Sequence, residues 1–348
     1  MTEKGKRLVF TAPFESAWQE FEVPERPGPF QVIVRTHKSL ISAGTELAVA
    51  SGTHRGFSLP QPGFAGYPHV PGYALVGEII ASSGEAGQLD PGFKVGARVF
   101  VKASHASHVV VDARRGALIP LPPRASDHQA LLARLASISM VGVRAGRIAP
   151  GDRVAVLGLG LIGQLAAQLA RACGARPVVG IDRNASRRDA AGQTGVTAIP
   201  LAEGDPGSIK NQLRVPGFDV VIEASGNPAS LPYALQLVAR GGRVVLLGSA
   251  RGTVEIDPYT FIHKPGIHVI GAHESNAPGQ ETPQARWTMK RNYELCLDQF
   301  IDGTLADAPL VSHIVPVADA GGIHREMYGA SGRYLGVVID WRNSASGA

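Results

Sequence analysis

Cysteine is scarce in this sequence: Cys173 and Cys296 are the only two among 348 residues. Two thiols can form neither a disulfide framework nor a zinc site with four cysteine ligands. A low cysteine content is typical of proteins that fold in the reducing cytosol. We therefore expect a cytoplasmic protein that depends on a packed core.

Long apolar runs and a strong charge of one sign are also missing. No stretch approaches the roughly 18 apolar residues of a membrane span. The N-terminal MTEKGKRLVF lacks the apolar core of a signal peptide. The net charge of +5 is small for this length, and no run of lysines and arginines stands out. The sequence therefore predicts no membrane association and no nucleic-acid partner.

Hydrophobic residues make up 44% of the chain, enough to bury a core in about two domains. Up to about Pro123, short apolar runs alternate with Gly and Pro turns, which predicts a β-rich region. Asp127 is a plausible N-cap of a helix, and after Pro150 apolar strands alternate with helical intervals. This alternation predicts an α/β fold with a parallel sheet.

The C-terminal part begins with a predicted helix. Thr282 is a candidate N-cap with Pro283 at the first helical position, and Gly303 can end the helix. The chain then closes with a predicted strand in YLGVVIDW.

The strongest motif is GLGLIG, with Gly158, Gly160 and Gly163. The apolar stretch VAVL precedes it, a helical pattern follows, and Asp182 ends the next strand 19 residues after Gly163. This order is the fingerprint of a Rossmann dinucleotide site, in which a pyrophosphate lies on the helix N-terminus. Gly158 permits the turn, Gly160 lets the backbone approach the pyrophosphate, and Gly163 permits close packing of helix and strand.

Asp182 indicates NAD(H), because its carboxylate can accept hydrogen bonds from the ribose hydroxyls and repels a 2′-phosphate. Arg183 and Arg187 follow directly and can instead hold that phosphate, so NADP(H) stays open. Further expected cofactor contacts lie in the loop and at the ends of later strands: Leu161, Ile162, Ala224, Ser225, Gly248, Ser249, Ala272 and His273.

Four stretches together give the chain a family resemblance: GTEL, VPGYALVGE, GDRVAVLGLGLIG and EASG. In this order the sequence resembles the medium-chain dehydrogenase/reductase superfamily. The resemblance implies a GroES-like β-rich catalytic domain in residues 1–126 and a Rossmann domain in residues 127–275. It also implies that residues 276–348 complete the catalytic domain.

The zinc ligands of the zinc alcohol dehydrogenases in that superfamily are replaced here. The resemblance places Ala43, Tyr73 and Ala133 at the three ligand positions, and none of them is a usual zinc ligand. We therefore expect no catalytic metal. The stretches ISAGTE, GYPHVPGY and VVIDW are similar to bacteriochlorophyllide dehydrogenases and to dehydrogenase-like proteins of sugar pathways.

Without zinc, a reacting oxygen still needs a hydrogen-bond donor and a proton partner. The resemblance places Tyr73 at the reacting centre, where it either donates a proton or fills the space of the metal. Thr45 matches the proton-relaying hydroxyl of zinc members, with a turn residue as the alternative. Glu46 matches the acid that braces the site and is also a candidate ion-pair partner.

Several histidines remain open candidates. His105 and His108 can form a small metal pair, although no third ligand is evident nearby in the sequence. His54 and His69 flank the expected cleft, and either can serve as an acid or base.

The leading hypothesis is a zinc-independent, NAD(H)-dependent oxidoreductase that acts on a hydroxyl or ketone of a sugar-like or specialised metabolite. The alternatives are an NAD(P)H-dependent reductase of an activated C=C bond and a dinucleotide-binding protein without activity. We expect a small-molecule substrate. The strand IHVIGA resembles an edge strand that pairs across a two-fold axis, so we also expect a homodimer.

Overall fold

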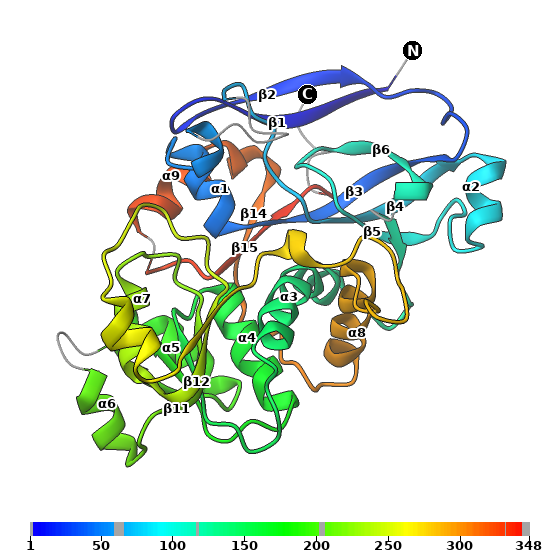
Figure 1. Ribbon diagram of the computed structural model, residues 1–348. Coiled ribbons are helices and arrows are strands. Elements are labelled where there is room, and N and C mark those ends of the chain that lie inside the picture. Colours follow the sequence, from blue (N-terminus) through cyan, green and yellow to red (C-terminus); the bar gives the residue numbers. More distant parts are fainter. Residues whose placement is uncertain (1–2, 59–65, 116–117, 202–205, 331, 343–348) are drawn as a thin grey trace. The chain divides into compact units, whose positions relative to one another are not determined.

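The computed structural model describes residues 3–58, 66–115, 118–201, 206–330 and 332–342 (Figure 1). The chain divides into two compact units. The first unit comprises Met1–Leu132 with Val311–Ala348, and the second comprises Ala133–Leu310. Among the described residues, no helix combines the length and the apolar character needed to cross a bilayer.

A seven-stranded sheet forms the centre of the first unit. Its order is β14-β15-β3-β4-β5-β7, and β6 also pairs with β3. The strands are β3 Gln31–Ile41, β4 Leu75–Ser82, β5 Arg98–Val101, β6 His108–Asp112, β7 Leu118–Pro120, β14 Val311–Pro316 and β15 Gly336–Asp340. β15, drawn in red, pairs with the blue β3, so the last part of the chain completes a sheet that the first part begins (Figure 1). β1 Lys4–Ala12 and β2 Glu15–Glu22 form a separate antiparallel hairpin.

Alternate residues of neighbouring strands build the core under this sheet. Val32 and Val34 on β3 pack with Leu75 on β4 in one buried cluster. Their spacing of two places their side chains on the same face of the sheet. Gly77 allows β4 to approach β3, because a Cβ at this position would lie 2.2 Å from the carbonyl oxygen of Arg35.

Helices of the first unit pack close to the ends of this sheet. They are α1 Ala43–Ala50, α2 Gly84–Leu89 and α9 Ala320–Gly329, with short 3₁₀ turns η1 Arg55–Phe57, η2 Ala113–Arg115 and η5 Val317–Asp319. α1 and α9 contact each other. Ile41, Ile323, Met327 and Trp341 share one buried cluster, which holds α9 against the sheet. The C-terminal part of the chain is thereby fixed beside the helix that carries Glu46.

The second unit is built on a six-stranded parallel sheet. Its order is β10-β9-β8-β11-β12-β13, the doubly wound order of the Rossmann fold. The strands are β8 Val154–Leu157, β9 Val178–Asp182, β10 Thr197–Pro200, β11 Phe218–Glu223, β12 Val238–Leu246 and β13 His268–Gly271. β8 and β9 are buried along their whole length, as expected for central strands of a parallel sheet.

Helices connect these strands and extend the unit. They are α3 Asp127–Ala145, which begins in the first unit, and α4 Leu161–Ala172, α5 Ala185–Gln193, α6 Pro206–Leu213, α7 Ser230–Leu237 and α8 Met289–Ile301. Two short helical segments, η3 Tyr259–His263 and η4 Glu274–Asn276, lie on either side of β13 in the chain. Ile209 on α6 and Leu235 on α7 join Leu157, Ile181 and Val221 of the sheet in one hydrophobic cluster.

The structure confirms the predicted alternation of strands and helices and corrects two helix starts. Ser126, rather than Asp127, caps α3: its Oγ accepts the N–H of Gln129 at 3.1 Å. α8 begins at Met289 after the N-cap Thr288, not after Thr282. Thr282 accepts the N–H of Ala285 in the same way, but this bond closes only a turn.

The segment directly before α8 packs against Arg144 of α3. The guanidinium of Arg144 lies 3.4 Å from the ring centroid of Trp287, directly before the cap. The Thr-Pro pair at 282–283 precedes this contact and does not start a helix. α8 ends as predicted, with Asp302 as C-cap and Gly303 at a φ of +81°.

The bounds of the two compact units differ from the domain ranges that we expected from the sequence. Residues 276–310 group with the second unit, although we expected them to complete the catalytic domain. A hydrogen bond of 3.0 Å from Arg144 Nε on α3 to Asn292 Oδ1 is one of the contacts that hold α8 in this unit. The assignment of one unit to catalysis and the other to the cofactor stays a prediction.

Candidate functional site

The glycine loop joins the end of β8 to α4 in the second unit. Gly158 has a φ of +89°, and a Cβ on it would lie 2.8 Å from the Cα of Ser225. A Cβ on Gly163 would lie 1.8 Å from the carbonyl oxygen of Gly158. Only glycine fits at these two positions.

Gly160, the N-cap of α4, is different because a Cβ built there meets no atom within 4 Å. The open space lies at the N-terminus of α4, where Leu161 and Ile162 form the first turn. Free N–H groups and the helix dipole favour a phosphate at such a position. The residues therefore fit the pyrophosphate of a dinucleotide.

Asp182 lies at the carboxyl end of β9 and is buried. Its Oδ2 accepts the N–H of Leu159 in the glycine loop at 2.7 Å, and its Oδ1 accepts the N–H of Asn184 at 2.8 Å. Arg187 places a guanidinium nitrogen 3.8 Å from Oδ2. The same carboxylate that was expected to bind ribose thus also holds the glycine loop.

A pocket of about 570 Å³ lies beside Asp182, a size typical of small-molecule sites. Of the predicted cofactor residues, it brings together Gly158, Asp182, Arg183, Arg187 and Ser225. Sequence analysis missed other residues of its lining, among them Asn227, Tyr233 and Gln236. These three follow the EASG motif and carry no signal of their own in the sequence.

Further predicted cofactor residues lie just after the carboxyl ends of three adjacent parallel strands, where ligands bind in this fold. They are Ala224, next to Ser225, after β11, Gly248 and Ser249 after β12, and Ala272 and His273 after β13. His273 caps the short η4 segment: its Nδ1 accepts the N–H of Ser275 at 3.2 Å. This bond turns one ring nitrogen of His273 toward its own backbone.

Glu223 is a buried residue at this strand end that sequence analysis did not assign. Its Oε1 accepts the N–H of Ser225 at 2.7 Å and also the Ser225 hydroxyl. Burial raises the pKa of Glu223, and the hydrogen bonds from Ser225 and Gly226 oppose this effect only in part. Glu223 therefore shapes the loop that lines the pocket.

In the first unit, Tyr73 contacts Ser42 through their two hydroxyl groups. Tyr73 lies two residues before the start of β4, and Ser42 is the N-cap of α1. Thr45 and Glu46, the other predicted catalytic residues, lie in the first turns of that helix. The backbone N–H of Ser42 donates to Glu46 Oε1 at 2.7 Å. Ser42 thereby connects Tyr73 with Glu46, a role that the sequence did not indicate.

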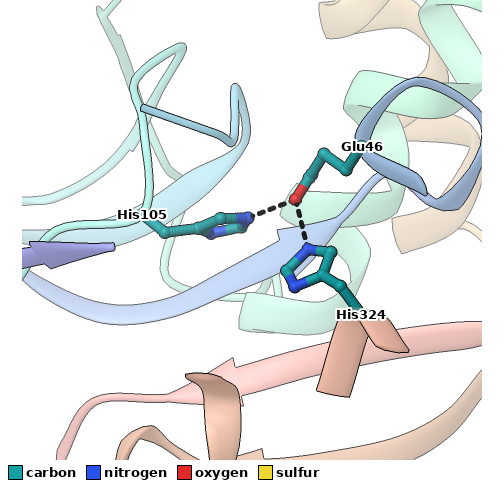
Figure 2. A group of neighbouring side chains, drawn as sticks. All are labelled: Glu46, His105 and His324. Atoms are coloured by element: carbon teal, nitrogen blue, oxygen red, sulfur yellow. Dashed lines mark hydrogen bonds and ion pairs between the residues drawn. The ribbon is translucent and has the colours of Figure 1, made fainter. Parts of the chain in front are cut away.

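Glu46 is the centre of a buried cluster with two histidines (Figure 2). His105 Nε2 and His324 Nε2 each lie 2.9 Å from the same oxygen, Glu46 Oε2. The three residues come from α1, from the loop between β5 and β6, and from α9. Burial alone would raise the pKa of Glu46, but the His105 charge and the hydrogen bonds from both rings outweigh it. The pKa of Glu46 is therefore held well below its usual range.

Other contacts orient His105 in the cluster. Ser39 Oγ lies 2.8 Å from His105 Nδ1 and also accepts the indole N–H of Trp341 at 2.9 Å. Gly72, at a φ of +98°, packs against the His105 ring, and a Cβ there would lie 2.8 Å from its Cδ2.

The expected pair of His105 and His108 does not form a common site. His108 lies on β6, and its Nε2 is 3.2 Å from Glu3 Oε1, whereas His105 joins Glu46 and His324. Sequence reasoning missed His324, because it follows Glu46 by 278 positions. No spacing pattern connects residues this far apart.

The two further histidine candidates make local contacts. His54 Nδ1 accepts the N–H of Gly56 at 3.0 Å. His69 exchanges two backbone hydrogen bonds with Phe10. Burial lowers the pKa of His69, and the charge of Glu46 opposes this shift.

The three positions that match the zinc ligands of the alcohol dehydrogenases do not fit zinc. Ala43 begins α1 and Ala133 lies buried in α3, and neither side chain has a donor atom. The phenol of Tyr73 bonds to Ser42. The side chains at these positions therefore lack the donor set of a zinc site.

Known proteins similar to this chain are dehydrogenases. A family model described as zinc-binding dehydrogenase matches residues 162–289. D-guloside 3-dehydrogenase of Shigella flexneri is 30% identical over 72% of this chain and 71% of its own length. 2-Desacetyl-2-hydroxyethyl bacteriochlorophyllide A dehydrogenase of Cereibacter sphaeroides is 26% identical over 97% and 98%. The structure of 2R,3R-butanediol dehydrogenase from Bacillus subtilis superimposes with a TM-score of 0.79 at 19% identity, covering 97% of this chain and 100% of that one.

The fold and the glycine loop agree with these similarities. The chain belongs to the medium-chain dehydrogenase/reductase superfamily and is an oxidoreductase. The resemblance inferred from the sequence motifs and the predicted fold class, a GroES-like part with a Rossmann α/β part, are confirmed.

We predict that Glu223→Gln makes stability less dependent on pH. A carboxyl group with a raised folded pKa contributes stability that is complete below its unfolded pKa and is lost as the pH rises through the folded value. Wild-type stability should therefore fall relative to Glu223→Gln as the pH rises above the ordinary pKa of a glutamate, about 4.3. Urea unfolding of both proteins across this range measures the difference.

The exposed Glu255→Gln provides the control, because it removes a carboxylate at the surface of the same unit. It should follow the wild type at every pH. A constant difference between Glu223→Gln and wild type across the range would contradict the buried titration.

Proposed function

We propose that this protein is a zinc-independent, NAD(H)-dependent dehydrogenase that interconverts a hydroxyl and a ketone on a sugar-like or specialised metabolite. The named activities of the relatives support this substrate class, since D-guloside 3-dehydrogenase and L-galactonate-5-dehydrogenase act on sugar derivatives by name. We further propose that it works in the cytoplasm as a homodimer. β13, an edge of the parallel sheet, offers a strand for pairing across the dimer axis.

The hydroxyl pair of Tyr73 and Ser42 is the observation that carries this proposal. NAD(H), when bound, supplies or accepts the hydride, and the reacting oxygen must gain or lose a proton. Tyr73 donates the proton to the forming alcohol. Ser42 then donates a hydrogen bond to the phenolate oxygen, and the N-terminus of α1 favours the negative charge there.

Glu46 supports this pair without taking part in the proton transfer. Its Oε1 accepts the backbone N–H of Ser42 at 2.7 Å, which fixes the residue whose hydroxyl contacts Tyr73. Thr45, in the first turn of the same helix, is the second hydroxyl available to a substrate. In this proposal the hydroxyl groups of Tyr73 and Thr45 provide the polar contacts to the reacting oxygen that zinc provides in other members of the superfamily.

Asp182 supports the choice of NAD(H). Its carboxylate lines the pocket and keeps acceptor capacity beyond its two backbone hydrogen bonds. A 2′-phosphate beside this buried carboxylate would meet repulsion and a desolvation cost. Arg183 and Arg187 lie in the same pocket, and the ion pair with Asp182 partly neutralises Arg187.

We predict that the wild type binds NADH more tightly than NADPH and that Asp182→Ala reduces this preference by about tenfold. The readout is the ratio of the NADH and NADPH affinities. Loss of the hydrogen bond from Leu159 should weaken the binding of both cofactors, so the separate affinities are less informative. Asp189→Ala, an exposed charge change on α5, should leave the ratio unchanged. Tighter binding of NADPH by the wild type would show that the arginines decide the specificity.

We predict that Tyr73→Phe lowers turnover by about 10²–10⁴, the usual contribution of a positioned acid–base group. Ser42→Ala and Thr45→Val should each cause a smaller loss. NADH affinity and melting temperature should stay nearly unchanged in Tyr73→Phe, because only a hydroxyl is removed.

The matched control is Tyr67→Phe. In the wild type, the Tyr67 hydroxyl donates to the carbonyl oxygen of Val49 in the same unit. This variant should keep wild-type turnover. If Tyr73→Phe also keeps it on the true substrate, Tyr73 is a space-filling residue and the proton has another source.

A further inference from the structure

We propose that Glu46, His105 and His324 form a binding site for one divalent transition-metal ion, with Zn²⁺ as the best match. None of these residues lies at the three positions where zinc dehydrogenases of the superfamily hold their catalytic metal. The ion would cross-link the unit rather than take part in hydride transfer.

The donor atoms converge in a manner that suits such an ion. The Glu46 oxygen and one nitrogen of each imidazole all lie within 4.8 Å of one another. Two histidines and one glutamate are a common ligand set for Zn²⁺. Bonds of about 2.0–2.1 Å place neighbouring ligands about 2.9–3.4 Å apart. Two of the three separations, each 2.9 Å, already have this length.

Surrounding residues orient two of the ligands from outside. A metal-bound histidine usually donates its second N–H to a fixed acceptor. Ser39 Oγ provides that acceptor 2.8 Å from His105 Nδ1 and is itself held by Trp341. The second oxygen of Glu46 is fixed by the Ser42 N–H at 2.7 Å. The metal-facing oxygen therefore has a defined direction before any ion binds.

Binding of an ion would change the protonation of the two histidines. In the hydrogen-bonded cluster, each imidazole presents an N–H to Glu46 Oε2. An ion would replace these two hydrogens: a neutral ring would carry its single proton on Nδ1 instead, and a charged ring would release its Nε2 proton to water and keep the proton on Nδ1. For His105, that proton points to Ser39.

The second ring nitrogen of His324 faces away from Glu46. Its side chain is 3% exposed, and its Nδ1 has no hydrogen-bond partner among the described residues. This nitrogen is not the one that faces Glu46, so a bound water, and not the proposed ion, would satisfy it. The ring is held by Glu46 and by an edge contact with Phe10 at 4.8 Å between ring centroids.

The ion would connect three segments that are distant in the sequence. His105 follows Glu46 by 59 positions, and His324 follows it by 278. A ligand that binds only the folded state stabilises it in proportion to its affinity and concentration. The main consequence would be resistance of the first unit to unfolding.

Titration of chelator-treated, tag-free full-length protein with Zn²⁺ and with Co²⁺ tests the proposal. We expect one ion per chain by calorimetry, visible d–d absorption on binding of Co²⁺, and a higher melting temperature with either ion. His324→Ala should lower the affinity by at least about 100-fold. Glu46→Gln, which is nearly isosteric, provides a second test if His324→Ala does not fold, as judged by circular dichroism.

Two variants serve as controls. His108→Ala removes another histidine of the same unit and should bind the ion as the wild type does. Tyr73→Phe should also bind normally while losing turnover, so failure of the metal site can be distinguished from failure of the proposed function. Absence of stoichiometric binding would mean a hydrogen-bonded cluster only, and equal binding by His324→Ala and Glu46→Gln would place the ion elsewhere. Either result overturns the proposal.

Discussion

The buried carboxylate of Glu46 is the constraint on which the first unit depends. A charge in a protein core is stable only when hydrogen bonds and opposite charges replace its water. Glu46 meets this requirement with the Ser42 N–H on one oxygen and with His105 and His324 on the other. These contacts bring three distant chain segments together and fix Ser42, whose hydroxyl contacts Tyr73.

A second carboxylate has a comparable place in the parallel sheet. Asp182 holds the N–H of Leu159 and thereby stabilises the glycine loop on which a pyrophosphate would lie. The residue that we propose to bind ribose thus also supports the loop of the proposed phosphate site. In each unit, one buried acid, Glu46 or Asp182, positions the backbone beside the groups that we expect to contact a ligand. The apolar surroundings of each acid have a low dielectric constant, which strengthens the hydrogen bonds of its carboxylate.

Regular patterns made much of the fold predictable from the sequence. The spacing of Gly158, Gly160, Gly163 and Asp182 follows from the geometry of one short strand–turn–helix–strand segment. The predicted dinucleotide site could therefore be recognised from a continuous stretch of sequence. His324 could not be recognised, since a contact across 278 positions leaves no periodic signal. The start of α8 was missed because Thr282 and Thr288 each accept the backbone N–H three residues later, so capping chemistry alone does not distinguish them.

Stopped-flow mixing of the purified protein with NADH and a panel of ketoses and enones tests the central claim most directly. The claim is that the Tyr73–Ser42 pair protonates a carbonyl oxygen during hydride transfer. We expect a ketose or related ketone to consume NADH, with a slower reaction when NADH carries deuterium at the transferred position. Consumption of NADH by the enones alone would indicate a C=C reductase, and binding without consumption by any compound would indicate a dinucleotide-binding protein. Either of these outcomes would contradict the account.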